Sequence, residues 1–426
     1  MSMSDILFII MGCLLIINIP IAVSMGLATL AAIAIIGKVP TLLVVQRMFT
    51  GMDSFPLLAI PLFMVAGLLM ERGGISRRLI GFASSLVGRV YGGLGIITIL
   101  ACMFFAAISG SAPATVVAIG SVMLPAMVRE GYDKTFAVAI LASAGTIGVI
   151  IPPSIPFVTY GITMNVSIGK LFAAGVVPGI LMGLALMIVC YVISMRRGYR
   201  SQTIAERHPL RAAREALLGI MMPVIILGGI YGGVFTPTEA AAVACVYSLI
   251  IGLFVYRELN VREVFTCMYN AAIPAAMVML IIGCAQGLGW VMTTEQVPVK
   301  IAQYVASITS SQITLLLMIN FVLLIVGCFM DLNASIILLG PIFLPLILRF
   351  GVDPVHFGVI MVVNMSIGLL TPPLGVNLFV ANSLRKDVVF KELVIKVLPM
   401  LGALLIVLLM LTYIPQLSML LANLIG

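Results

Sequence analysis

Charged side chains are scarce in this chain. Asp, Glu, Lys and Arg supply 9% of the 426 residues, whereas apolar residues supply 62%. An ordinary soluble domain carries about 25% charged residues, so this composition excludes a soluble globular protein. The sequence also lacks a phosphate-binding loop of the form G-x-x-x-x-G-K-[ST], and it therefore predicts no ATPase activity in this chain.

Residue types that bind metals or catalyse reactions are equally sparse. The two histidines, His208 and His356, lie far apart in the sequence, and the seven cysteines occur singly, without CxxC spacing. Isolated cysteines in apolar runs are typical of small packing residues rather than of metal ligands or disulfides. A membrane enzyme would need clustered His, Asp or Glu residues, which this sequence lacks, so we predict that the protein is not an enzyme.

The positive charge of the chain is concentrated in one place. The formal net charge is +8, and six arginines lie between residues 196 and 214, in and beside a long polar loop. An arginine-rich loop between apolar runs indicates the cytoplasmic side of a membrane protein. No basic surface with interleaved aromatic residues accompanies it, so the sequence predicts no binding to nucleic acid.

Long apolar runs are abundant. They recur along the whole chain, and many are long enough to cross the hydrocarbon core, which takes about 20 helical residues. A backbone in lipid must satisfy its own hydrogen bonds, and the Leu, Ile, Ala and Met content favours helices over a barrel. We predict an all-α polytopic membrane protein with about 10–12 transmembrane helices. The number stays open because the runs 5–37 and 217–256 could each form one long helix or two short ones.

An internal repeat divides the chain. Segments 120–153 and 340–373 align without a gap, with 11 identities in 34 positions, where chance would give about three or four. Both copies end in a Pro-Pro pair inside an apolar stretch. Helices broken at matching points in two halves are typical of secondary transporters, where they place backbone carbonyls near an ion or a substrate.

The two halves, 1–205 and 206–426, contain the same order of predicted elements. In each half a polar, helix-breaking turn precedes an apolar stretch that is too short to cross the membrane but long enough for a re-entrant hairpin. We favour an inverted relation between the two repeats. The predicted hairpins are 109–130 and 329–350, and the predicted broken helices are 133–165 and 354–382.

The hairpin turn and the helix break of one repeat are predicted to face each other. Proline removes the donor for the carbonyl one turn back, and such carbonyls with nearby hydroxyls suit Na⁺, whereas half-helix N-termini favour an anionic substrate. Substrate contacts are predicted at Ser154, Asn377 and Thr371. We predict two or more sodium sites, formed by Ser109, Gly110, Ser111, Thr115, Thr146, Gly148 and Pro152 in the first repeat and by Asp331, Asn333, Ser366, Gly368, Thr371 and Pro372 in the second.

Each of these features also has a structural interpretation. A Pro-Pro pair can be only a kink, and Ser or Thr can bond back to its own helix. Asp331 is the sharpest candidate, because a carboxylate at membrane depth is costly unless it is paired, but it could also lie at the interface at the end of a span. Glu239, Asp133 and Asp353 have the pattern of charges in the first turn of a helix.

Six strings in the chain have the form of family motifs: GMDSFPLLAIP (51–61), SGSAPATVVAIGS (109–121), GVIIPPSIP (148–156), FTPTEAAAV (235–243), HFGVIMVVN (356–364) and GLLTPPLGVNLFVA (368–381). With them the chain resembles, over essentially its whole length, the large membrane subunit of the tripartite ATP-independent periplasmic (TRAP) transporters. One departure is Leu68, where many relatives carry Glu, so no role can be assigned to that carboxylate here.

The resemblance implies sodium-coupled uptake of an organic acid across the bacterial inner (cytoplasmic) membrane. It implies an elevator mechanism, in which hairpins and broken helices move against a scaffold. The implied partners are a small membrane subunit of the Q type and a periplasmic substrate-binding protein of the P type. The region 148–180 favours sialic acid as the substrate, with a C4-dicarboxylate next.

Two other functions stay open on the sequence alone. A channel also uses re-entrant hairpins, although usually as oligomeric repeats around one pore. A structural subunit of a larger membrane complex would need no polar turns at matching positions of its two halves.

Overall fold

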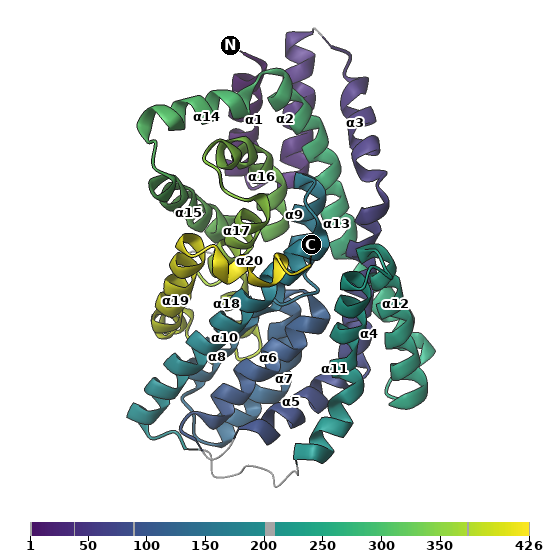
Figure 1. The fold of residues 1–426 in the computed structure, drawn as a ribbon, viewed down its shortest axis with the longest axis vertical. Coiled ribbons are helices and arrows are strands. Elements are labelled where there is room, and N and C mark those ends of the chain that lie inside the picture. The colour runs from purple at the N-terminus through teal and green to yellow at the C-terminus, as the bar shows by residue number, and fades with distance from the viewer. Residues whose placement is uncertain (1, 38, 88–89, 201–208, 373–374, 426) are drawn as a thin grey trace.

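The computed structural model describes residues 2–37, 39–87, 90–200, 209–372 and 375–425. Its regular elements in these ranges are helices, apart from one isolated β-bridge between Tyr91 and Arg200 (Figure 1). Nine of the described helices are long and apolar enough to cross a membrane, and shorter apolar helices accompany them. The predicted all-α polytopic fold is confirmed, and the chain is a multi-pass membrane protein.

The first repeat extends from α1 to α10. Ser2 and Asp5 form a capping box at the start of α1, and the Asp133 carboxylate accepts the Phe136 N–H at 3.0 Å, which confirms Asp133 as a helix-start charge. The elements are α1 (Met3–Ile16), α2 (Ile21–Ile36), α3 (Leu42–Met52), η1 (Phe55–Leu58), α4 (Ala59–Arg72), α5 (Ile75–Leu86), α6 (Gly93–Ser109), α7 (Ala112–Arg129), α8 (Lys134–Gly145), η2 (Thr146–Val149), α9 (Ile155–Met164) and α10 (Ile168–Arg197).

The second repeat extends from α11 to α20. Thr236 and Glu239 form a capping box at the start of α12, and the Asp353 carboxylate caps α17, so both acids have the predicted structural role. The elements are α11 (Pro209–Tyr231), α12 (Pro237–Ile250), η3 (Ile251–Val255), α13 (Val261–Thr294), α14 (Val297–Ile308), α15 (Gln312–Phe329), α16 (Leu332–Arg349), α17 (Pro354–Gly368), α18 (Val376–Ser383), α19 (Phe390–Tyr413) and α20 (Gln416–Ala422).

The two ambiguous apolar runs each form two helices. The run 5–37 breaks between α1 and α2, where Asn18 has a φ of +66° and Pro20 precedes the new helix. The run 217–256 breaks between α11 and α12, just before Pro237. Proline fixes φ and lacks a donor, so it begins a helix more readily than it continues one.

The repeats are inverted, as predicted. The amphipathic helix of the first repeat, α5, lies near the lower end of the molecule, whereas its counterpart α14 lies near the upper end (Figure 1). The long helix α13 corresponds to α3, η1 and α4 taken together, and these two long elements pack side by side along their length. In this contact, a Cβ added at Gly283 would lie 3.0 Å from the Met52 sulfur, so glycine permits the close approach.

The arms of the two hairpins differ from the prediction. Residues 112–129 form the single helix α7, and 332–349 form the single helix α16, so neither range folds back on itself. Pro125 and Pro345 are accommodated inside these helices without reversing the chain. The polar turns lie where predicted, but the first arms are the preceding helices, so the hairpins are α6–α7 and α15–α16.

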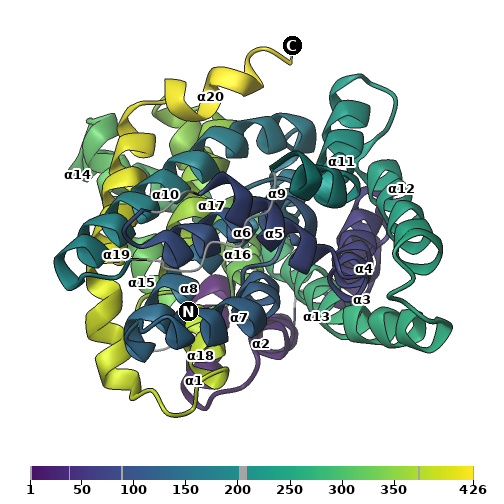
Figure 2. The same cartoon turned by 90° about the horizontal axis from the view of Figure 1, so that it is seen from below.

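The broken helices occupy the centre of the molecule. Every residue of α8 after Lys134 and every residue of α17 after Pro354 is buried. A helix that is apolar on all sides belongs in a core. In the view along the long axis, α17 lies among the inner helices, with α11, α12 and α13 to one side and α19 to the other (Figure 2). The breaks between α8 and α9 and between α17 and α18 therefore lie inside the protein rather than in lipid.

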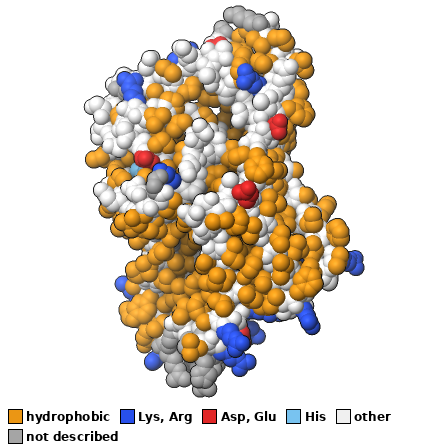
Figure 3. All heavy atoms as spheres, turned by 45° about the vertical axis from the view of Figure 1, so that its right-hand side comes forward, with side chains coloured by type: hydrophobic (Ala, Val, Ile, Leu, Met, Phe, Trp, Pro, Cys, Tyr) orange, Lys and Arg blue, Asp and Glu red, His pale blue; other side chains and the backbone are white. Residues whose placement is uncertain are grey.

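The outer surface is largely apolar. Large hydrophobic side chains are exposed along one face of α13, including Phe265, Tyr269 and Met277. Hydrophobic side chains cover most of the face in Figure 3, and Lys and Arg side chains gather mainly at its edges. This distribution fits a surface that meets lipid or another membrane protein.

Candidate functional site

The first hairpin turn is a compact cluster of oxygen atoms. Helix α6 ends at Ser109, Gly110 adopts a left-handed conformation (φ +59°), and Ser111 begins α7. The hydroxyls of Ser109 and Thr115 share a hydrogen bond of 3.0 Å, and the Thr115 hydroxyl donates to the Ser111 carbonyl at 2.8 Å. Both hydroxyls are buried, and no formal charge lies among these three residues.

This turn packs directly on the break of the same repeat. A Cβ added at Gly148 would lie 2.6 Å from the Thr115 hydroxyl oxygen and 2.8 Å from the Ser111 carbonyl oxygen. A Cβ added at Gly110 would lie 2.7 Å from the Pro153 carbonyl oxygen. Only glycine allows both approaches, so the predicted juxtaposition of turn and break is present in the first repeat.

The other candidates in the first repeat lie along the same break. The Thr146 hydroxyl donates to the Ser143 carbonyl within its own helical turn, and Pro152 lies in the irregular segment between η2 and α9. The Ser154 hydroxyl donates to the Val149 carbonyl at 2.6 Å and caps α9, so it spans the break. Thr146 and Ser154 are completely buried.

The second hairpin turn is built differently. The Asp331 carboxylate accepts the N–H groups of Asn333 and Ala334, at 2.9 and 3.2 Å, and thereby caps α16. The Asn333 side-chain oxygen accepts a hydrogen bond from Thr159 of α9, at 3.1 Å, so it contacts the first repeat rather than the break at 366–372. No hydrogen bond joins Asp331 or Asn333 to that break within the described part of the chain.

The second break packs on the first arm of its hairpin rather than on the turn. A Cβ added at Gly368 would lie 2.7 Å from the backbone of Gly327, near the end of α15. The hydroxyls of Ser366 and Thr371 donate to carbonyls of their own helix. Pro372 lies in the irregular segment after α17, and Pro373 lies outside the described residues. The pairing of turn and break is therefore looser in the second repeat.

Asn377 brings the two breaks together. It lies at the start of α18, is fully buried, and donates to the Ala142 carbonyl of α8 at 3.4 Å. A Cβ added at Gly145 would lie 3.4 Å from its amide nitrogen. Its side-chain oxygen has no hydrogen-bond partner among the described residues. A buried acceptor beside the first break is well placed to bind an ion or a polar group of a substrate.

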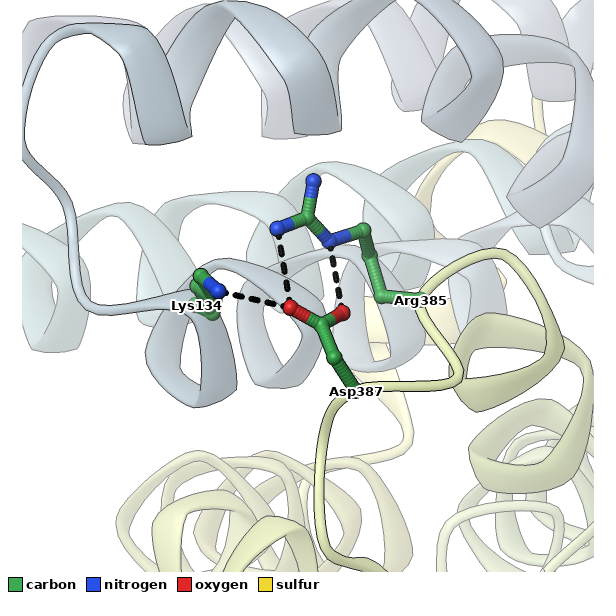
Figure 4. Close-up of polar contacts among 3 residues, drawn as sticks. All are labelled: Lys134, Arg385 and Asp387. Carbon is green, nitrogen blue, oxygen red and sulfur yellow. Dashed lines mark hydrogen bonds and ion pairs between the residues drawn. The ribbon is translucent and has the colours of Figure 1, made fainter.

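The repeats are also joined at the surface, by an ion-pair cluster (Figure 4). Asp387, in the loop between α18 and α19, accepts from Lys134 of α8 at 2.7 Å and from both Nε and Nη2 of Arg385. The Lys134 ammonium, together with the Arg385 guanidinium, lowers the pKa of the Asp387 carboxyl below its usual range. No local pattern predicts this pair, because Lys134 and Asp387 are 253 positions apart.

A small cavity borders the first hairpin turn. It has a volume of about 180 Å³, and Ser109, Ser111 and Asn270 line it. Leu68 also lines this cavity, as does Glu71, one helical turn further along α4. A carboxylate is therefore present near the turn although position 68 lacks one, and no motif in the sequence singles out Glu71.

A buried polar network begins one helical turn before the second break. The Asn364 amide of α17 donates to the Asn320 side chain of α15 at 2.8 Å, and the Asn320 amide donates to the Thr412 hydroxyl of α19 at 2.9 Å. All three residues are buried. The sequence feature that indicates such a network is a single asparagine in a long apolar run, because a polar side chain in a membrane span needs a partner.

Residues 8–417 match the family model described as "Tripartite ATP-independent periplasmic transporter, DctM component". The chain is 50% identical over 421 residues to the isethionate TRAP transporter permease protein DctMQ of Oleidesulfovibrio alaskensis, and the match covers 98% of this chain and 66% of that protein. It is 47% identical over 381 residues to the C4-dicarboxylate TRAP transporter large permease protein DctM of Pseudomonas aeruginosa, with 89% of each chain covered. It is 39% identical over 412 residues to the sialic acid TRAP transporter large permease protein SiaM of Vibrio cholerae, with 96% of each chain covered.

A solved structure supports the fold. The YdaH transporter of Alcanivorax borkumensis, whose crystal structure is described as having an unusual topology, matches with a TM-score of 0.63. The match covers 90% of this chain and 87% of that chain, at 16% sequence identity. At this identity the likeness concerns the fold alone.

Proposed function

The chain belongs to the DctM family of tripartite ATP-independent periplasmic transporters, a family of membrane permeases rather than enzymes, and from this membership we propose sodium-coupled uptake of an organic acid. The first turn and break, from Ser109 to Ser154, supply the sodium site. Asn377 and Ser154 lie where a substrate would meet that site. The second repeat supplies a further sodium site near Gly368 and Thr371.

One observation carries the sodium proposal. The Thr115 hydroxyl and the Ser111 carbonyl face Gly148, the Ser109 hydroxyl bonds to Thr115, and none of these groups carries a formal charge. Uncharged hydroxyl and carbonyl oxygens at a helix break suit a monovalent, oxygen-seeking cation such as Na⁺. The partial positive charge at the N-termini of α7 and α9 would then attract an anionic substrate to the same place.

The substrate is an organic anion. The three relatives named above carry the names of isethionate, C4-dicarboxylate and sialic acid, all of which are organic acids. The region 148–180 favours sialic acid among them, whereas the 50% identity favours isethionate. These three compounds are therefore the ones to compare.

The protein works with partners in the bacterial inner membrane. TRAP membership supports a periplasmic binding protein and a small Q-type membrane subunit as partners. One relative is named DctMQ and is longer than this chain, so the Q-type partner exists either as a separate protein or as part of the same polypeptide.

The test is uptake into liposomes that contain the complete transporter, with the binding protein added outside. We expect an inward Na⁺ gradient to drive accumulation of at least one of isethionate, sialic acid and succinate. A K⁺ gradient of the same size, or ATP without Na⁺, should drive none. Equal uptake under the K⁺ gradient would contradict sodium coupling.

A further inference from the structure

A cavity away from the breaks lies between the paired helices α3 and α13 on one side and α16 on the other. Its volume is about 720 Å³. Helices α3 and α13 form one wall, and α16, with Thr163 of α9, forms the other. These elements lie in the upper half of the molecule in Figure 1. The cavity thus borders α16 and α9, which belong to the hairpins and broken helices proposed to move, and α3 and α13, which belong to the proposed scaffold.

Its lining contains one ionic side chain. Arg47 of α3 is the only charged residue among the described residues that line the cavity. Arg47 is exposed and makes no ion pair or hydrogen bond with another described side chain. Gln286, Trp290 and Thr293 line the cavity from one face of α13, at the spacing i, i+4 and i+7. The opposite wall is apolar, with Leu338 of α16 among its residues.

The position of Arg47 relative to this face is fixed by close packing. Gly51, one turn after Arg47 on the same helix, lies against the Gln286 side chain, where a Cβ would clash. A Cβ added at Gly287 would lie 3.2 Å from the Val44 side chain. Helices α3 and α13 are therefore closely packed, and Arg47 lines the same cavity as the amide of Gln286, the hydroxyl of Thr293 and the indole of Trp290.

We infer that this cavity is a first binding site for the transported solute, on its way to the site beside Asn377 and Ser154, and that Arg47 there pairs with its anionic group and selects an organic acid with a single negative charge. The inference rests on the proposed function and narrows its substrate class. A guanidinium pairs with a carboxylate or a sulfonate through two parallel hydrogen bonds. Gln286 and Thr293 supply partners for hydroxyl or amide groups on the rest of the solute, and Leu338 contacts its apolar part.

A dicarboxylate fits this cavity poorly. Arg47 is the one charged group among the described residues of the lining, so a second carboxylate would find no second cation there. Isethionate and sialic acid each carry one negative charge, whereas succinate carries two. An anionic lipid headgroup shares the chemistry of the first two, so the experiment must separate solute from lipid.

Trp290 provides a direct readout, because it is the only tryptophan in the chain. The purified full chain is titrated in detergent with isethionate, sialic acid and succinate while tryptophan emission is recorded. We expect a saturable change with at least one of the two monoanions, and half-saturation at about tenfold or higher concentration with succinate. In Arg47→Gln the monoanion response should weaken about tenfold or more, and Arg47→Lys should recover part of it.

The matched control is Arg262→Gln, which removes an exposed arginine of α13 outside the cavity. Its titration should equal that of the unaltered chain. Equal responses to succinate and the monoanions, an unchanged response in Arg47→Gln, or no response to any of the three would overturn the inference.

Uptake by the complete transporter separates the remaining outcomes. Arg47→Gln should raise the KM for the monoanion about tenfold or more in liposomes both with and without anionic lipid. A defect confined to liposomes with anionic lipid would assign Arg47 to a headgroup and overturn the inference. If the unaltered transporter takes up none of the three anions, the proposed function fails, whereas an Arg47-dependent emission change would still establish the anion site.

Discussion

At the scale of single residues, glycine decides how the first turn and break fit together. Gly148 faces the Thr115 hydroxyl and the Ser111 carbonyl so closely that any side chain at position 148 would overlap them. Such a position can be recognised from sequence only as a glycine near a proline pair. Its partners follow from the fold, because they lie on the other side of a helix reversal.

Gly148→Ala should impair the site more than the fold. The added methyl group would lie 2.6 Å from the Thr115 hydroxyl, and overpacking of this kind typically costs about 1–3 kcal/mol. We expect sodium-driven uptake to fall about tenfold or more, with a higher sodium concentration needed for half-maximal rate. Gly402→Ala, where nothing lies within 4 Å, is the control and should match the unaltered protein. Normal uptake in Gly148→Ala would argue against a sodium site at this contact.

Substitutions at Asp331 distinguish its role as a helix cap from its proposed role in binding Na⁺. The carboxylate caps α16, and asparagine caps a helix about as well as aspartate. We therefore expect Asp331→Asn to keep the thermal stability of the protein while lowering its apparent affinity for Na⁺, measured from the sodium dependence of uptake. Asp331→Ala, which removes the cap, should lower both. If uptake by Asp331→Asn keeps the same sodium dependence, Asp331 is a cap alone.

At the scale of elements, the sequence predicted the positions of the helix interruptions, because these depend on local residue types. Clusters of proline, glycine and polar residues interrupt the helices at both turns and both breaks, which lie where these residues indicated, whereas the single prolines Pro125 and Pro345 lie inside helices. The length of the hairpin arms could not be read in the same way, because an 18-residue helix such as α7 is compatible with either a span or half of a hairpin. The hydrogen bond between Thr159 and Asn333 joins the two repeats, and its residues are 174 positions apart, so no local pattern predicts it.

The network of Asn364, Asn320 and Thr412 joins α17, α15 and α19. Asn320→Leu would leave the Asn364 amide without its side-chain partner, and a hydrogen bond between helices in a membrane is worth about 1–2 kcal/mol. We expect the Tm in detergent to fall by a few degrees, while the sodium dependence of uptake stays the same. Ser307→Ala is the control, because Ser307 is exposed and bonds only within its own helix. Equal Tm values for the two variants would mean that the network does not hold these helices together.

At the scale of the whole molecule, the inverted repeats suggest two bodies. The broken helices form the buried centre together with the hairpins that pack on them, and the paired elements α3–α4 and α13 lie beside them. The repeat could be found from the sequence because it preserves identical residues at a constant offset. Movement between the bodies could not be found in this way, because it depends on which surfaces slide past each other and not on the residues of either surface alone.

A cross-link between the two bodies tests the proposed elevator. Ala114 of α7 and Ala271 of α13 line the same small cavity from opposite bodies, so cysteines at both positions lie within reach of a short, reducible bifunctional thiol reagent. In a background without the seven native cysteines, we expect the reagent to stop sodium-driven uptake and a reductant to restore it. The matched control joins Leu68→Cys to Ala271→Cys, which line that cavity from α4 and α13, both in the proposed scaffold. This second cross-link should leave uptake unchanged, because it does not connect a moving part to a fixed one. Full uptake by the cross-linked 114–271 pair would mean that α7 and α13 keep their relative position throughout transport, and a moving hairpin body would then be ruled out.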